Sequence, residues 1–247
     1  MFNIRDAIIK RLFINSLKQQ CKSGFTNINQ AISLFNQMSS LDSLPSAMDF
    51  NHLFNAISKM KPQRHHSVII SLSRQLELSG LRPNMHTLGI LTNCYCHLGR
   101  VDFAFSLLGK RIKLGFDPDI VIFTTLINGI IDDNYNNVGQ AVKLLDKIVK
   151  LGIQPNVVTY GAVVKGLCRK GNNVGAINFL RRMQSDGVCK PDVVMYTIII
   201  DSLCKENMMS QAVNLLEEMQ REGISPNVVT YSALVQGCCN SENGKRP

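Results

Sequence analysis

A short phrase recurs along this chain: a glycine, then three or four positions later a proline, then asparagine or aspartate. Its five prolines are separated by 35, 37, 36 and 35 residues: Pro83, Pro118, Pro155, Pro191 and Pro226. A fixed period of this length indicates a repeat architecture, in which each repeat buries its apolar face only against its neighbours. The period therefore constrains the fold more than any single motif.

Each period has the pattern of two amphipathic helices. Counted from the residue after Pro-Asn or Pro-Asp, positions 4, 7, 8 and 11 are apolar, as in Tyr160, Val163, Val164 and Leu167. Val193–Ile200 has the propensity of a strand, but the helical spacing recurs in successive repeats and predicts a helix there too. The second helix carries one alanine at a fixed place: Ala104, Ala141, Ala176 and Ala212.

The predicted fold is all-α, a right-handed α-solenoid superhelix of helix-turn-helix repeats of about 35 residues. Glycine is expected to end each second helix, and the Asn or Asp after proline to begin the next first helix. The predicted divisions are a mitochondrial targeting segment (1–28), a partial repeat made of a second helix (29–46), repeats 1 to 5 (47–84, 85–119, 120–156, 157–192, 193–227) and a truncated repeat 6 (228–247).

The targeting segment is predicted from charge and spacing. Asp6 is the one acidic residue among the first 25, which contain five basic residues: Arg5, Lys10, Arg11, Lys18 and Lys22. With Ile4, Ile8 and Leu12 on one helical face, this pattern is typical of a mitochondrial leader. The alternative is an ordinary leading helix of the solenoid.

The net charge favours one class of partner, and the hydropathy argues against a membrane-spanning protein. The 247 residues carry 27 Lys and Arg against 18 Asp and Glu, a formal charge of +9 that favours a polyanionic partner. Apolar stretches such as Val193–Ile200 fall far short of the ~18 residues that span a bilayer, so no membrane span is expected.

Four of the eight cysteines share position 12 of their repeats: Cys96, Cys168, Cys204 and Cys239. A cysteine fixed at the end of an apolar helix face is interpreted as a packing residue. Neither Cys94-Tyr-Cys96 nor Cys238-Cys239 has zinc spacing, and no secretory signal is visible, so free thiols in a reducing compartment are expected.

Other reactive side chains are interpreted as solvated. His65 and His66 are adjacent in an inserted turn, and Asp132 and Asp133 lie beside an Asn-rich loop. The chain lacks a phosphate loop and a nucleophile elbow. It is therefore expected not to be an enzyme, and to need no cofactor and no metal.

The repeated wording, as in Val157-Val-Thr-Tyr160 followed by Gly-Leu-Cys, Ala and Gly-x-x-Pro, resembles the pentatricopeptide repeat family, in its P class. The resemblance covers about residues 29–247. The wording around Asp49–Asn51, Ser58–Lys61 and Leu107–Lys110 is similar to the restorer-of-fertility-like plant subgroup. This resemblance implies sequence-selective binding of single-stranded organellar RNA, about one base per repeat, in RNA processing, stability or expression.

The resemblance also implies the site residues. In this family, position 5 and the last residue of a repeat read one base: Asn51, Asn84, Gly89, Asp119, Thr124, Asn156, Gly161, Asp192, Thr197, Asn227 and Ser232. Position 2 flanks the base: Met48, His86, Val121, Val158, Val194 and Val229. A basic position 13 approaches phosphate: Lys59, Arg169 and Lys205. Single-strand readers combine flat contacts, base-edge hydrogen bonds and positive charge in this way.

The family's pairing rule gives expected bases. Asn51 with Asn84 is associated with cytosine, and the Thr-Asn pairs of repeats 3 and 5 with adenine. Gly89 and Gly161 have no side chain to read a base, so repeats 2 and 4 are expected to be poorly selective. Since the family runs parallel to its RNA, the expected core is C-N-A-N-A from 5′ to 3′.

Alternatives remain for the same residues. The Asn and Asp that end the repeats are good helix N-caps whatever the protein binds, and the valines at position 2 could be packing spacers.

The alternative functions are a helical-repeat scaffold for protein partners or a truncated, non-functional family member. The expected protein is a monomer in the mitochondrion, with the chloroplast as alternative, that recruits a nuclease or other processing factor.

Overall fold

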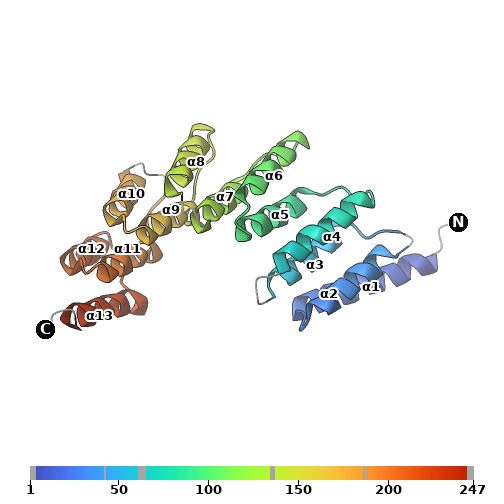
Figure 1. The fold of residues 1–247 in the computed structure, drawn as a ribbon, viewed down its shortest axis with the longest axis horizontal. Helices are drawn as coiled ribbons and strands as arrows, with labels where there is room; N and C mark the ends of the chain where they lie inside the picture. The colour runs from blue at the N-terminus through green and yellow to red at the C-terminus, as the bar shows by residue number, and fades with distance from the viewer. Residues whose placement is uncertain are drawn as a thin grey trace. The chain divides into compact units, whose positions relative to one another are not determined.

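The computed structural model describes residues 4–41, 43–60, 65–133, 137–185, 187 and 189–243. Over these residues the chain is entirely helical and forms no strand, which confirms the all-α prediction (Figure 1). The thirteen helices are α1 (Ile4–Ser23), α2 (Ile28–Ser39), α3 (Ala47–Ser58), α4 (His66–Leu78), α5 (Met85–His97), α6 (Val101–Lys113), α7 (Ile120–Asp132), α8 (Val138–Lys150), α9 (Val157–Arg169), α10 (Asn173–Ser185), α11 (Val193–Lys205), α12 (Met209–Arg221) and α13 (Val228–Asn243).

The helices alternate as the period predicts. The odd-numbered helices from α3 to α13 are first helices, and each begins at the residue predicted to start a repeat. The even-numbered helices from α4 to α12 are second helices. The Val193–Ile200 run lies inside α11, so helical periodicity overrides its local strand propensity.

The chain divides into two compact bodies, an N-terminal body of residues 1–118 and a C-terminal body of residues 119–247. The largest fully buried side chains of the N-terminal body include Leu17, Phe50 and Phe54. Those of the C-terminal body include Leu126 and Tyr196. Within each body, successive first helices pack on one another and each second helix packs beside its own first helix.

Capping fixes where the first helices begin. Asn84, Asp119, Asn156, Asp192 and Asn227 each accept a hydrogen bond from the backbone N–H three residues on, at 2.9–3.0 Å. These five side chains are therefore helix N-caps, as the sequence allows. The second helices end at glycines in the left-handed region, such as Gly80 with a φ of 86° and Gly223 with a φ of 74°.

Small residues let the helices approach. Four of the second helices, α6, α8, α10 and α12, carry a fully buried alanine: Ala104, Ala141, Ala176 and Ala212. Position 10 of the first helices is small as well, and a Cβ added at Gly237 would lie 2.7 Å from the Cβ of Cys204. At Gly237, therefore, α13 approaches α11 too closely to leave room for a Cβ.

The segment predicted to target the chain is partly outside the described residues, since residues 1–3 and the side chains up to Arg11 are not described. Its described part packs on repeat 1. Leu17 is 1% exposed in the core with Phe50 and Phe54, and Phe13 is partly buried against it. The division at residue 28 stays a prediction.

Two interpretations from the sequence are wrong. His66 is 4% exposed at the start of α4, and its ring lies 4.7 Å from that of His97, because the inserted turn ends earlier than the period suggests. Cys239 is exposed rather than packed, because no described element covers its face of α13. Cys96 and Cys204 are buried as expected, and Cys168 is half-buried.

Candidate nucleic-acid interface

Position 2 of the first helices carries an exposed apolar side chain in the C-terminal body. Val121, Val158, Val194 and Val229 are 69%, 65%, 55% and 63% exposed. Side chains that stand this far into solvent are not packing spacers, so that alternative is wrong for these four valines. In the N-terminal body Met48 is 45% exposed and His86 is also exposed at the same position.

The base-reading pair of repeat 1 is brought together by the first turn of α5. The Nδ2 of Asn51 donates to the Oδ1 of Asn84 at 3.0 Å. The same Oδ1 accepts the backbone N–H of Thr87 at 2.9 Å, while the Thr87 hydroxyl lies 2.9 Å from the Oδ1 of Asn51. The two predicted residues therefore meet, and a third residue, which the sequence analysis did not single out, closes the cluster.

Repeats 3 and 5 build the same cluster with a threonine at position 5. The hydroxyls of Thr124 and Thr159 lie 2.7 Å apart, and that of Thr159 lies 3.0 Å from the Oδ1 of Asn156. In repeat 5 the hydroxyls of Thr197 and Thr230 are also 2.7 Å apart, and that of Thr230 lies 3.1 Å from the Oδ1 of Asn227. The third position of the next repeat therefore links each pair.

Repeat 4 has no such cluster. Gly161 has no side chain at position 5, and Met195, 1% exposed, covers it with its Cγ 3.9 Å from where a Cβ would stand. Asp192 still caps α11 through the N–H of Met195 at 2.9 Å. In repeat 2, Gly89 lies on α5 of the N-terminal body and Asp119 begins the C-terminal body.

The two residues of each base-reading pair differ in how accessible they are to solvent. Asn51 is 2% and Thr197 is 8% exposed, because the following first helix covers position 5. Asn156 and Asn227, which end their repeats, are exposed, and so is Ser232 on α13. In repeats 3 and 5, the capping amide is thus the more accessible member of each pair.

The three predicted phosphate contacts are exposed but differ in their partners. Lys59 has no ion pair among the described residues and shares an open depression with Lys18 and Lys22. Arg169 pairs with Asp132, and Lys205 pairs with Asp201 at 2.6 Å. Two of the three cations are therefore already neutralised.

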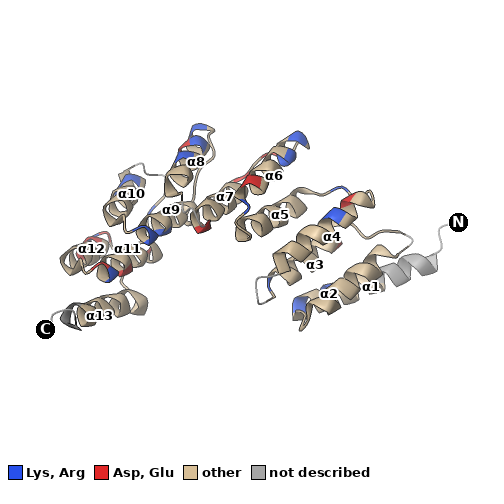
Figure 2. Cartoon of the chain, in the orientation of Figure 1, with Lys and Arg blue, Asp and Glu red and all other residues tan. Residues whose placement is uncertain are grey.

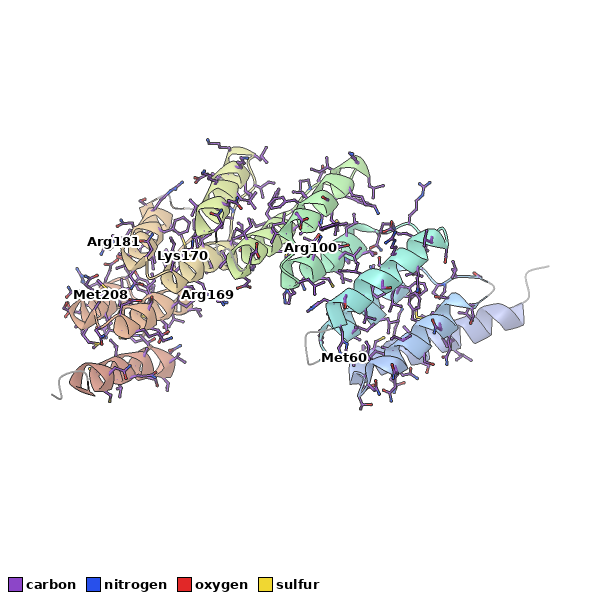
Figure 3. All side chains as sticks on the ribbon, viewed as in Figure 1. Met60, Arg100, Arg169, Lys170, Arg181 and Met208 are labelled. Carbon is purple, nitrogen blue, oxygen red and sulfur yellow. The ribbon has the colours of Figure 1, made fainter. Side chains whose placement is uncertain are left out.

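The acidic partner of Arg169 comes from the neighbouring repeat. Asp132 is the last residue of α7 and Arg169 the last of α9, and Figure 2 shows acidic and basic colour together at these two helix ends. Figure 3 labels Arg169 beside Lys170 at the same end of α9. The Asp132 side chain is 50% exposed, in agreement with its interpretation as solvated, and it also forms an ion pair with Arg169.

Cys94 and Cys168 are poor candidates for thiol chemistry, and the described residues hold no metal-binding cluster. Among them, no group of three or more His, Cys, Asp or Glu side chains could hold a metal ion. Burial raises the pKa of Cys168 to about 11 and that of Cys94 to about 12, which keeps both as neutral thiols at pH 7.

Within the described part of the chain, none of the helices combines the length and apolarity needed to cross a membrane.

Comparison with known proteins agrees with the helical-repeat fold. Residues 118–169 and 191–240 match the PPR repeat family model, and residues 86–116 and 158–188 match the PPR repeat model. Together these matches cover more than half of the chain. This chain belongs to the PPR repeat family.

Relatives of this PPR chain include two mitochondrial pentatricopeptide repeat-containing proteins of Arabidopsis thaliana. One is 41% identical over 127 residues, which is 51% of this chain and 20% of the relative. The other is 39% identical over 105 residues, which is 42% of this chain and 16% of the relative. The matched part of the PPR chain thus spans a fifth or less of these relatives.

The fold of the PPR chain resembles that of the maize pentatricopeptide repeat protein PPR10, solved in complex with an 18-nucleotide psaJ RNA element. The TM-score is 0.54 at 24% identity, covering 87% of this chain and 35% of PPR10. At this identity the likeness supports the helical-repeat fold.

Proposed function

We propose that this PPR chain binds single-stranded organellar RNA with sequence selectivity, about one base per repeat, and has no catalysis of its own. The observation that carries the proposal is the recurrent site at the joins of repeats 1, 3 and 5. At each of these sites a position-5 side chain, on a helix that also presents a side chain at position 2, hydrogen-bonds to the start of the next first helix. The RNA complex of PPR10 supports the same assignment.

The chemistry of the surface suits a single strand. Exposed valines at a constant position offer flat apolar contacts for bases, which are accessible only when they are not paired. Amide and hydroxyl groups beside them can hydrogen-bond a base edge, and Lys59 and Lys165 are exposed and lack an ion-pair partner among the described residues. This combination of stacking, edge contact and cation is the one that single-strand binders use.

The proposed base preferences follow the pairs. Repeat 1 with Asn51 and Asn84 prefers cytosine, and repeats 3 and 5 prefer adenine, which gives a core of C-N-A-N-A read 5′ to 3′. Repeats 2 and 4 contribute little selectivity, since Gly161 offers no side chain and is covered by Met195. Each good base contact is worth about 1–3 kcal/mol, if the scale for bidentate readout holds here.

Selection from a random single-stranded RNA library tests the function. The wild-type chain should enrich C-N-A-N-A, and duplex RNA and peptides should compete poorly. The double change Thr197→Asn with Asn227→Asp should move the fifth preference from adenine to uracil and leave the first and third unchanged. Enrichment of no motif, or binding to peptides instead, would favour the protein scaffold.

The cellular setting is proposed from the family. The two relatives described above are named as mitochondrial, and the P class and the restorer-of-fertility-like subgroup are the proposed placement within the family. A role in processing, stabilising or expressing a mitochondrial transcript, with a recruited nuclease or other factor, follows from that placement. Crosslinking the tagged chain to RNA in isolated mitochondria and in chloroplasts would locate the transcript and decide between the organelles.

A further inference from the structure

We propose that the threonine at the third position of the following repeat is a specificity-determining positioning residue, which fixes the hydrogen-bonding groups that the pair before it offers to a base. The residues are Thr87, Thr159 and Thr230. The inference rests on the proposed function, because it assigns a third member to the same site. The threonines are 5%, 0% and 0% exposed, so they act through the pair and do not touch RNA themselves.

Capping sets the polarity of the site in repeat 1. The backbone N–H of Thr87 can only donate, so the atom of Asn84 that receives it is the amide oxygen. Asn51 must then offer its nitrogen to that oxygen and turn its own oxygen to the Thr87 hydroxyl, 2.9 Å away. The free groups are one N–H of Asn51 and the NH₂ of Asn84, and both are donors.

This donor pattern suits the base that the pair is proposed to read. Cytosine presents two neighbouring acceptors, O2 and N3, on its Watson–Crick edge. The Thr87 hydroxyl, which lies 2.9 Å from the Asn51 oxygen and 3.0 Å from the Asn84 oxygen, acts with the Asn84 oxygen to keep the Asn51 oxygen turned away from that edge. Without the hydroxyl, the Asn51 amide loses one of the two partners that orient it and keeps only the Asn84 oxygen.

In repeat 3 the hydroxyls form a chain. Thr124 lies 2.8 Å from the carbonyl oxygen of Ile120 and 2.7 Å from the Thr159 hydroxyl, which lies 3.0 Å from the Oδ1 of Asn156. The contact between the two hydroxyls needs a proton, so the Thr124 proton points either to Ile120 or to Thr159. In both cases Thr124 offers a base only its lone pairs.

The other half of this site is a donor. The Oδ1 of Asn156 accepts the backbone N–H of Thr159 at 3.0 Å, so its NH₂ group is the part left for a base. A donor beside an acceptor matches adenine, which presents N1 and N6–H₂ on one edge. Repeat 5 repeats this chain with Thr197, Thr230 and Asn227.

Repeats 2 and 4, which have glycine at position 5, show what happens where there is no pair to orient. At the joins where position 5 is glycine, the third residue has no hydroxyl: Met195 follows Gly161, and Ile122 follows Gly89 in the sequence. Asp192 and Asp119 still cap their helices there. Capping alone therefore does not require threonine at the third position, but an oriented pair does.

The test uses the full chain and single-stranded RNA oligonucleotides with a C-N-A-N-A core whose third base is varied. Thr159→Val removes the hydroxyl and keeps the backbone N–H that caps α9. Thr159→Ser restores the hydroxyl. The matched control is Thr92→Val, because Thr92 is equally buried and its hydroxyl bonds only the carbonyl of Leu88 at 2.8 Å.

Thr159→Val should reduce the preference for adenine at the third base roughly fivefold, the value of about one hydrogen bond, and leave the first and fifth preferences intact. Thr159→Ser and Thr92→Val should behave as wild type. Thr87→Val provides the same test at the first base in the other body. Selectivity kept by Thr159→Val, or lost equally at all three bases, would overturn the inference. A wild-type chain without base preference would overturn the proposed function as well.

Discussion

Gly237→Ala should destabilise the C-terminal body, although alanine is the better helix former. Gly237 lies inside α13, and a Cβ there would stand 2.7 Å from the Cβ and 2.9 Å from the Sγ of Cys204. The Cβ of Cys204 is fixed to the backbone of α11, so it cannot rotate away. One of the two helices must move.

The magnitude follows from two opposing effects. Overpacking of a closely packed site costs about 1–3 kcal/mol, and this contact belongs at the upper end because an atom bound to the backbone is involved. Replacing a mid-helix glycine by alanine contributes about 1 kcal/mol in the opposite direction. The free energy of unfolding should therefore fall by about 1–2 kcal/mol.

Gly161→Ala is the matched control, because its Cβ would meet only the Cγ of Met195 at a comfortable 3.9 Å. That variant should gain about 0.5–1 kcal/mol. Urea unfolding followed by circular dichroism measures both free energies, and hydrogen exchange locates the loosened helix, expected to be α13. If Gly237→Ala were stabilised as much as Gly161→Ala, the close approach of α13 to α11 would be refuted.

Three further outcomes are expected. Asp132→Asn should free Arg169 for phosphate and steepen the slope of log affinity against log salt by up to ~0.7, measured by fluorescence anisotropy; an unchanged slope would remove Arg169 from the RNA path. Cys204→Ser should lower the free energy of unfolding by about 1–3 kcal/mol in denaturant, whereas exposed Cys239→Ser should be neutral; equal effects would contradict the assigned burial. Since burial raises the pKa of Cys94 from 9.0 to about 12, its stabilisation is complete below pH 9 and lost as the pH rises toward 12; Cys94→Ala should flatten that loss in a pH series of unfolding free energies.

Much of the fold could be predicted because the period and the caps are local signals. The proline and Asn or Asp phrase places the starts of α5, α7, α9, α11 and α13 to the residue, since the capping side chain bonds the N–H three positions on. The burial of His66 could not be predicted in this way. It depends on where α4 begins after an insertion of irregular length, and on a ring of α5 that comes to lie beside it.

Only part of the candidate site could be predicted from the sequence. Position 5 and the capping residue could be predicted from the family wording, but the third member could not. Within a single repeat, nothing about Thr159 distinguishes it from other polar residues between an exposed Val158 and an apolar Tyr160. Its role depends on a contact with Thr124, 35 residues earlier, which only the stacking of α9 on α7 creates. The ion pair of Arg169 with Asp132 also joins residues of two successive repeats, so a single repeat does not predict it.

The five capping residues have a consequence for how such an array changes over generations. Asn and Asp are nearly equal as N-caps, and both occur here, holding the same backbone contact at 2.9–3.0 Å. Exchange of one for the other alters charge and donor groups at the surface while the helix start is kept. During evolution, such proteins can therefore exchange Asn and Asp at each join without losing the N-cap that starts the helix. N-capping therefore sets little barrier to this exchange, which leaves the Asn or Asp at each join open to selection by the ligand.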